Sequence, residues 1–505
     1  MKRDRLIWVI IFIVGFSVRC TDLFHPVDTE SWREADDSTI ALNFYKNGTN
    51  IFHPQIAWDG NGPGYTESEF QIYPYLMKIS YKIFGFWEPT GRVISFLFSL
   101  ATMLVFFRFS SYLLSLKSAM IASFFFALSP ILTVISVAIR PESVMFFFYL
   151  CSAYTFIRWL DSQSKSYYWL AIFFTALALL SKITAGNIGI LFLILILFKK
   201  GWKFLLKPKV LILGALSIIP SILWYSYGRQ FYVLYGNSLG LSNEHSWIGW
   251  DFFTNRHFII NLIANELSNV WLTPGLLIVI LALASTKLIK KESTFLVICW
   301  LAAVFFSYII TIRTTSQSWA YYYHIFSIPA ASILLGTSVV ELYEKYSPGL
   351  YFRRKIVMHR AAIVKSSIII LFLLLFLSYY LVSAFNYQTK TKEAIFQTYE
   401  VYACKDSLKK LIPPQSLLLA NGSYIKGAAG YPLAYNNSYL FYWLNCKGYN
   451  IGIEDLSIKN ILLFKSRGCA FFLAETKFCK PELKNELKKK FTPIFECNGN
   501  ILFKL

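Results

Sequence analysis

The chain has little charge for its length. Only 15% of its 505 residues are Asp, Glu, Lys or Arg, and 56% are hydrophobic, whereas ordinary globular proteins are about 25% charged. A soluble fold of this size needs far more polar surface. The sequence also lacks an internal repeat, a Walker loop, a paired-Cys metal motif and a Ser-His-Asp arrangement. It has no basic stripe with interleaved aromatic residues, which argues against a nucleic-acid partner.

Long apolar runs take up most of the chain. A bilayer core about 30 Å thick needs around 20 helical residues to cross it. The runs therefore predict an α-helical polytopic membrane protein of about 11 transmembrane helices, the first of them an uncleaved span rather than a signal peptide. The predicted spans are 6–23, 90–112, 118–138, 142–160, 167–181, 186–198, 210–228, 262–286, 293–312, 325–343 and 366–386.

The net charge of +21 is concentrated in short breaks between these runs. Basic clusters at 199–209, 287–291 and 353–360 are typical of cytoplasmic loops by the positive-inside rule. A cytoplasmic N-terminus places all three on that side of the membrane. Two large segments then lie outside the cytoplasm, an outer loop at 24–89 and the C-terminal residues 387–505. We expect a membrane domain over 1–386 and a small extracytoplasmic domain over 387–505.

The C-terminal segment has the pattern of a small α/β domain. A short apolar strand at 416–420 is expected to end in an Asn-Gly turn, and a second strand at 469–474 follows a helix near 454–467. Residues 492–505 have the pattern of a β-hairpin. Up to two disulfides are expected in an oxidising compartment, with unpaired buried thiols as the alternative. The cysteines concerned are Cys404, Cys446, Cys469, Cys479 and Cys497.

The outer loop holds an unusual share of the acids, nine of the chain's 28. Residues 36–47 are expected to form an amphipathic helix on the membrane surface. Asp36 and Asp37 would then lie in its first turn, where the helix dipole favours negative charge. That explanation suits Asp37. For Asp36 and Glu34, we favour a general base acting on an acceptor hydroxyl or amine, or a ligand of a divalent cation beside a lipid phosphate.

Further candidates lie at the outer ends of the predicted spans. Glu69 precedes an aromatic-Pro turn that leads back to the membrane, and Glu142 follows Arg140 and Pro141, where it also suits a helix N-terminus. Lys182 either snorkels to the interface or binds a lipid phosphate. His324 is a phosphate contact, a metal contact or a structural residue, and it follows tyrosines typical of an interfacial aromatic belt.

Two segments of the outer loop, 32–45 and 58–70, carry a family resemblance. Trp32-Arg33-Glu34-Ala35-Asp36 and Trp58-Asp59-Gly60-Asn61-Gly62-Pro63-Gly64-Tyr65-Thr66-Glu67-Ser68-Glu69-Phe70 resemble the first outer loop of membrane glycosyltransferases of the GT-C superfamily. The branch that they resemble holds the protein O-mannosyltransferases and the aminoarabinose transferases. The resemblance implies sugar transfer from a polyprenyl-phosphate donor to a lipid, polysaccharide or protein acceptor, with inversion, at the outer face of a bacterial inner membrane.

The resemblance also assigns expected roles to residues. The family's loop acid falls on Asp36 or Glu34, because Arg33 replaces an acid found in part of the family. Glu69 resembles a second loop acid, and Phe70 stands where lysine is often found. A divalent metal, if one binds, would use Asp36 and Glu69. The expected donor-phosphate and substrate contacts are Arg33, Arg140, Glu142, Lys182, Tyr323 and His324. The competing hypothesis is a transporter or flippase of a polyprenyl-linked lipid, which would need charges inside the bundle.

Overall fold

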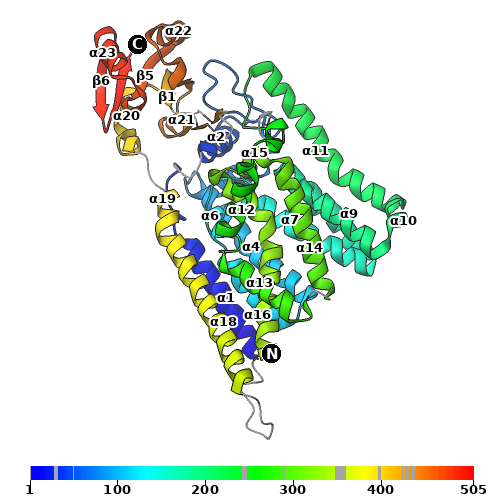
Figure 1. Ribbon diagram of the computed structural model, residues 1–505. Helices are drawn as coiled ribbons and strands as arrows, with labels where there is room; N and C mark the ends of the chain where they lie inside the picture. Colours follow the sequence, from blue (N-terminus) through cyan, green and yellow to red (C-terminus); the bar gives the residue numbers. More distant parts are fainter. Residues whose placement is uncertain are drawn as a thin grey trace.

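The computed structural model is a bundle of long helices with a small mixed sheet at one end, and the N-terminus lies at the opposite end of the bundle (Figure 1). The structure describes residues 2–27, 32–48, 50–241, 247–288, 291–346, 360–395, 400–422, 425–426, 432–434 and 438–505. The basic cluster predicted at 353–360 lies largely outside these residues.

The bundle is built from helices that follow the apolar runs. They are α1 (Lys2–Cys20), α4 (Thr90–Leu113), α5 (Leu116–Ala127), α6 (Pro130–Ile135), α7 (Glu142–Ser162), α8 (Lys165–Ser181), α9 (Asn187–Lys200), α11 (Pro208–Tyr235), α12 (His257–Asn269), α13 (Pro274–Ser285), α14 (Glu292–Ile310), α16 (Ile328–Tyr346) and α18 (Arg360–Asn386). Short helical elements connect them: η1 (Ile183–Gly186), α10 (Trp202–Leu205), η3 (Trp250–Phe253), α15 (Ile312–Thr315), η5 (Ser318–Ser327), η6 (Tyr387–Thr391) and α19 (Lys392–Ile395).

Among the described residues, seven helical segments are long and apolar enough to cross a membrane, and the bent pair α12–α13 makes an eighth. The other predicted spans fall on α1, α5 and α8. Of these, α5 and α8 are shorter apolar helices, and α1 begins with four charged residues. The predicted polytopic helical fold is confirmed.

Two predicted spans are broken in the structure. The span at 118–138 divides because Pro130, at the start of α6, has no N–H to continue the ladder of α5. The span at 262–286 bends by 89° between α12 and α13. Leu272 and Thr273 lie at that bend with φ of +48° and +42°, a backbone conformation that no apolar pattern predicts.

The outer loop forms α2 (Trp32–Lys46) and α3 (Ile72–Phe84). The expected helix at 36–47 was placed too late, because α2 begins at Trp32 and its first-turn acid is Glu34. Residues 34–41 are buried all round the helix, which packs against α3 and against α21 (Ser438–Leu444). The exposed apolar side chains expected of a surface helix are instead at the end of α3, where Ile83 and Phe84 are 66% and 82% exposed.

The C-terminal residues form a mixed five-stranded sheet in the order β4-β1-β5-β7-β6. Strand β1 pairs in parallel with β4 and β5, and β7 pairs antiparallel with β5 and β6. The elements are η7 (Glu400–Cys404), α20 (Lys405–Leu411), β1 (Leu417–Gly422), β2 (Ile425–Lys426), β3 (Pro432–Ala434), α21, β4 (Gly448–Gly452), η8 (Ile453–Asp455), α22 (Ile458–Ser466), β5 (Cys469–Glu475), η9 (Thr476–Phe478), α23 (Pro481–Lys490), β6 (Thr492–Cys497) and β7 (Asn500–Lys504).

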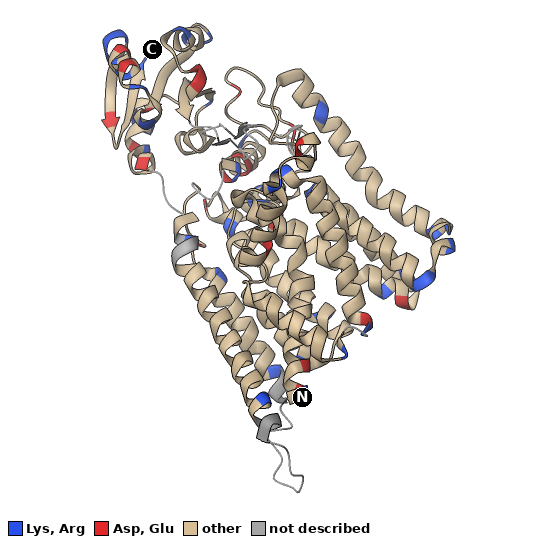
Figure 2. Cartoon of the chain, viewed as in Figure 1, with Lys and Arg blue, Asp and Glu red and all other residues tan. Residues whose placement is uncertain are grey.

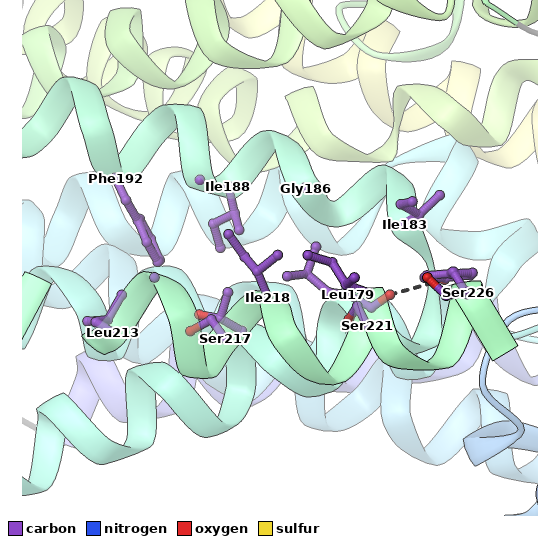
Figure 3. Close-up of a pocket in the computed structure, with 15 residues that line it drawn as sticks. Leu179, Ile183, Gly186, Ile188, Phe192, Leu213, Ser217, Ile218, Ser221 and Ser226 are labelled. Carbon is purple, nitrogen blue, oxygen red and sulfur yellow. Dashed lines mark hydrogen bonds between the residues drawn. The ribbon is translucent and has the colours of Figure 1, made fainter. Parts of the chain in front are cut away.

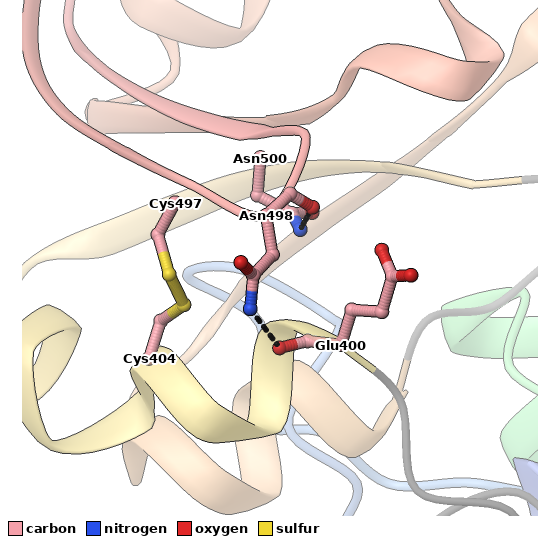
Figure 4. The surroundings of a disulfide bond; sticks show 5 residues. All are labelled: Glu400, Cys404, Cys497, Asn498 and Asn500. Carbon is pink, nitrogen blue, oxygen red and sulfur yellow. Dashed lines mark hydrogen bonds between the residues drawn. A yellow bond between two sulfur atoms is a disulfide. The ribbon is translucent and has the colours of Figure 1, made fainter.

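The predicted second strand, helix and terminal hairpin match β5, α22 and β6–β7. The turn expected at Asn421-Gly422 is wrong, because β1 continues through both residues. The Asn421 side chain accepts a hydrogen bond from the Glu475 backbone N–H at 2.7 Å, which holds the end of the strand in the sheet. One disulfide forms, between Cys404 and Cys497 (Figure 4). The other three cysteines of this segment are unpaired.

The charged residues are unevenly distributed over the molecule. Lys, Arg, Asp and Glu gather in the C-terminal sheet, around α2 and at the ends of helices, while the bodies of the helices carry few of them (Figure 2). The buried charged residues include Glu34, Asp36, Asp37 and Glu69 of the outer loop and Arg92 at the start of α4.

Candidate active site

Glu34 is held on every side. On α4, Arg92 donates two hydrogen bonds to its carboxylate, both at 2.8 Å, and the Ile139 backbone N–H donates a third at 2.8 Å. Both side chains are completely buried. Arg92 also donates to the backbone carbonyls of Pro26 and Val137. The pair therefore joins α2, α4 and the segment before α7.

Asp36, two residues later, is also completely buried but far less engaged. The indole N–H of Trp58 donates to its Oδ1 at 2.9 Å. Its Oδ2 has no hydrogen-bond partner among the described residues. Burial raises the pKa of Asp36 to about 7, although Trp58, Arg33 and Ser438 each lower it. A carboxylate that titrates near neutral pH can accept a proton in this range.

Asp37 faces a different group of charges. Arg33, one turn earlier on α2, lies between Asp37 (Nε to Oδ2, 3.5 Å) and Glu69, to which it donates a hydrogen bond. Arg33 also donates to the Leu239 carbonyl at 2.7 Å. Burial raises the pKa of Asp37 to about 8 against the opposing effect of Arg33. The helix-dipole explanation expected for Asp37 is wrong, because Asp37 lies in the second turn of α2.

Four of the six predicted donor-phosphate and substrate contacts form a second cluster, namely Arg140, Glu142, Lys182 and Tyr323. Lys182 donates to Glu142 at 2.5 Å, and Arg140 lies 3.8 Å from the same carboxylate. Tyr322 stacks on both cations, 4.2 Å from the Arg140 guanidinium and 5.2 Å from the Lys182 ammonium. Tyr323 lies 5.0 Å from Lys182. Aromatic faces at these distances stabilise cations, so this cluster holds two positive charges at a fixed position.

His324 lies apart from that cluster, although it directly follows the two tyrosines. Its Nδ1 is 2.7 Å from Glu266 on α12, and its Nε2 is 2.9 Å from the Thr315 carbonyl. The ring is completely buried and has both nitrogens engaged by the protein. In this arrangement His324 fixes η5, the element that supplies Tyr322 and Tyr323.

An apolar cavity of about 460 Å³ opens between α8, η1, α9 and α11 (Figure 3). Leu179 and Ile183 line it on either side of Lys182, and the Tyr225 hydroxyl donates to the Leu179 carbonyl at 3.1 Å. The loop that carries Glu69 is tied to the same end, since the Phe70 N–H donates to the Leu180 carbonyl at 3.0 Å. The cavity wall is therefore continuous in the chain with Lys182, and the loop of Glu69 is hydrogen-bonded to the same segment.

The predicted metal pair has few free donors. One oxygen of Asp36 accepts from Trp58, and Glu69 accepts from Arg33. Within the described residues, no group of three His, Cys, Asp or Glu side chains is arranged to hold an ion.

Three contributors to the site were missed by the sequence reasoning. Arg92 lies inside a predicted span and has no local partner in the sequence. Tyr322 was explained as part of an aromatic belt, and Asp37 as a helix-capping residue. One signal was available for Arg92, because a charged residue inside an apolar run needs a buried partner.

Comparisons with known proteins agree on the class of fold. Residues 71–225 match the family model described as dolichyl-phosphate-mannose-protein mannosyltransferase. No curated protein sequence matches the chain significantly. The predicted resemblance to the branch of the mannosyl- and aminoarabinose transferases is confirmed by the family-model match, and the solved structures described next show the fold.

Two solved structures are similar to this chain in fold. ArnT from Cupriavidus metallidurans, bound to undecaprenyl phosphate, superposes with a TM-score of 0.62 at 12% identity, over 99% of this chain and 97% of ArnT. The oligosaccharyltransferase AglB from Archaeoglobus fulgidus, in complex with an inhibitory peptide and a dolichol-phosphate, superposes with a TM-score of 0.58 at 10% identity. That match covers 94% of this chain and 69% of AglB. A further AglB structure is a complex with Zn and sulfate. These comparisons give no support to a flippase.

Proposed function

We propose that this protein is a glycosyltransferase that moves a sugar from a polyprenyl-phosphate donor to an acceptor in the cell envelope. The observation that carries the proposal is the apolar cavity lined by Leu179 and Ile183, the segment that also holds Lys182, which is paired with the buried Glu142. A cavity of this shape suits a hydrocarbon chain with an anionic head group. The family match and the ligands bound to ArnT and AglB support the same substrate class.

The donor is proposed to bind with its isoprenoid chain along α11 and its phosphate at Lys182 and Arg140. The phosphate leaves as an anion, so it needs fixed positive charge more than a proton. Glu142 forms ion pairs with both cations. Arg33, which is bound to Glu69, is proposed to contact the sugar.

Asp36 is proposed as the general base. The acceptor oxygen or nitrogen forms a bond to the anomeric carbon while the bond from that carbon to the lipid phosphate breaks, and the acceptor proton passes to Asp36. A single displacement of this kind inverts the anomeric carbon. We prefer Asp36 to Glu34, because both oxygens of Glu34 already accept hydrogen bonds. No step is assigned to a metal ion.

The proposal places the reaction outside the cytoplasm at a bacterial inner membrane. Residues 1–386 form the catalytic membrane part, and 387–505 form the outer α/β domain. This orientation is supported by the position of the C-terminal sheet and α2 at one end of the bundle and the N-terminus at the other (Figure 1).

The test blocks the cavity and follows the product. Gly214 lines the cavity on α11, and a Cβ there meets no atom within 4 Å. Gly214→Phe should fill the cavity and abolish transfer from a long-chain donor. The matched control is Leu211→Phe, because Leu211 lies on the same helix and is 59% exposed.

Mass spectrometry of envelope glycans and lipids gives the readout, in cells that contain the wild-type protein, either variant, or none. The wild type and Leu211→Phe should yield an envelope component carrying one additional sugar. Loss of that sugar in Gly214→Phe supports the proposed donor site. Equal modification in both variants would overturn it, and no modification in wild-type cells would count against the transferase itself.

A further inference from the structure

A segment of the outer loop extends the C-terminal sheet. Strand β4 lies at the edge of the sheet. The Gly60 N–H donates to the Gly448 carbonyl at 2.7 Å, and the Gly448 N–H donates to the Ala57 carbonyl at 3.0 Å. The Asn61 side chain donates to the Arg467 carbonyl at 3.0 Å. Residues 57–61, which we call the clip, therefore cover backbone groups that an edge strand would otherwise leave unpaired.

Gly60 makes this contact possible. Its φ is +56°, and a Cβ at this position would lie 1.9 Å from Cζ of Tyr449. Any larger residue would push the Tyr449 ring away from the loop. The clip therefore depends on a backbone position where only glycine fits.

The clip holds a residue of the candidate active site. Trp58, inside it, donates to the Asp36 carboxylate at 2.9 Å. At the start of α21, Ser438 donates to the Trp32 carbonyl at 2.9 Å, one helical turn before Asp36 on α2, and it lowers the pKa of Asp36. Both groups are positioned by the C-terminal elements from η7 to β7, which we call the C-terminal unit. Trp58 is positioned through β4, and Ser438 belongs to α21.

Other contacts hold the same unit against α2. The Trp443 indole donates to the Val27 carbonyl at 2.7 Å, and Lys46 donates to the Asn445 side chain at 2.9 Å. Apolar side chains of the two parts share one core, in which Ala35 and Ala41 of α2 pack with Tyr439 and Trp443. The C-terminal unit is thus fixed along the length of α2 rather than at one point.

We propose that the C-terminal unit positions the Asp36 carboxylate for reaction, with Trp58 and Ser438 as positioning residues and the clip as the element that aims Trp58. This inference rests on the proposed function of Asp36 as the base. It assigns the C-terminal unit a part in the active site rather than a separate binding role.

The positioning groups leave a signature in the pH profile. The charged groups that act on Asp36 and its neighbour are Arg33 and Asp37 on α2, and Glu69 and Glu142 act in turn on Arg33 and Asp37. The Glu34–Arg92 pair joins α2 to α4. All of these stay in place when Trp58 or Ser438 is changed. Because both positioning groups lower the pKa of Asp36, removing either should raise it further. The acid limb of kcat/KM should then move to higher pH.

The first experiment breaks the clip without touching the site. Gly60→Ala and Gly48→Ala both force alanine to a positive φ, but the Cβ at Gly48 meets no atom within 4 Å. Hydrogen exchange of peptides covering residues 57–62 and 447–450 should speed up in Gly60→Ala and stay as in the wild type in Gly48→Ala. Transfer should fall at least tenfold in Gly60→Ala alone. Unchanged exchange and transfer in Gly60→Ala would overturn the clip.

The second experiment measures transfer against pH in Trp58→Phe and Ser438→Ala. The acid limb should move upward in both, with rates approaching the wild type at alkaline pH, while binding of undecaprenyl phosphate is unchanged. An unmoved limb in both variants would overturn the positioning role. A wild-type protein that binds no undecaprenyl phosphate and transfers no sugar would instead refute the proposed function, so the two failures are distinguishable.

Discussion

Glu34 and Asp36 lie two residues apart on α2, and neither is exposed to solvent. Glu34 accepts three hydrogen bonds, two of them from a guanidinium. Asp36 accepts one, from a neutral indole, and keeps one oxygen without a hydrogen bond from the described residues. The same helix therefore carries two different acids. Glu34 faces α4 with its charge paired and hydrogen-bonded, whereas Asp36 faces the outer loop with a single hydrogen bond.

This difference in hydrogen bonding suggests that Glu34 stabilises the fold and that Asp36 takes part in the reaction. A buried charge that is paired and hydrogen-bonded costs little, and removing its partner costs a great deal. A buried carboxylate without such partners holds its proton more tightly, which suits a base that works near neutral pH. Both side chains are completely buried, so burial alone does not tell which of them is the general base.

The largest expected effect is on the stability of Glu34→Gln. This change leaves Arg92 buried without its counter-ion, which should cost about 3–5 kcal/mol. We expect a much lower apparent Tm in detergent, or no folded protein. The measurement is a thermal unfolding scan of the purified protein.

The control for that variant is Glu344→Gln. Glu344 pairs with Lys117 at the surface, where the two side chains are 51% and 73% exposed. Exposed pairs of this kind contribute little, so its Tm should equal that of the wild type. If Glu34→Gln keeps the Tm of the wild type and loses sugar transfer, Glu34 rather than Asp36 is the general base.

The next effect is on transfer in Asp36→Asn. A missing general base typically costs about 10²–10⁴-fold in rate. Because Asn can still accept the Trp58 hydrogen bond, insertion and folding should be intact. Sugar transfer in proteoliposomes and Tm are measured on the same preparation. Near-normal transfer would remove Asp36 from the mechanism.

The helical fold was predictable because hydropathy is a local property. Each predicted span falls on a helix or a broken pair of helices, since a membrane helix needs only its own apolar run. The start of α2 was placed four residues late for the opposite reason. Trp32 packs against a core that includes Ile40 and Leu239, and Glu34 pairs with Arg92, 58 residues away. Neither partner is visible in the local pattern.

The candidate residues could be named from the sequence, but their partners could not. The density of acids and the family motifs marked the outer loop, and Lys182 and Glu142 were named separately as expected substrate contacts. The roles depend on which partner each carboxylate meets, and these partners come from distant segments. Ser438, beside Asp36, lies about 400 residues further along the chain.

Stability should also depend on pH through Asp36. Its pKa rises from an ordinary 3.8 to about 7 on folding, so between these values the native state binds more protons than the unfolded state. Stability therefore falls as pH rises through this window, and the full cost is present above pH 7. Asp36→Asn should have a higher Tm than the wild type at pH 8, and the difference should shrink towards pH 4. An identical Tm difference at both pH values would show that folding does not raise the pKa of Asp36.

The smallest effect is expected in Asp37→Asn, and it sharpens the comparison between neighbouring acids. Burial raises the pKa of Asp37 to about 8, so the wild-type side chain is mostly neutral at pH 7 and a neutral amide changes little there. Above pH 8 the wild type gains a negative charge beside Arg33 that the variant lacks, because these groups lie 3.5 Å apart. Transfer by the two proteins should agree below pH 7 and diverge modestly above pH 8. If Asp37→Asn abolishes transfer at pH 7 while Asp36→Asn does not, the base is the acid that faces Arg33, and the oxygen of Asp36 without a hydrogen bond has no part in the chemistry.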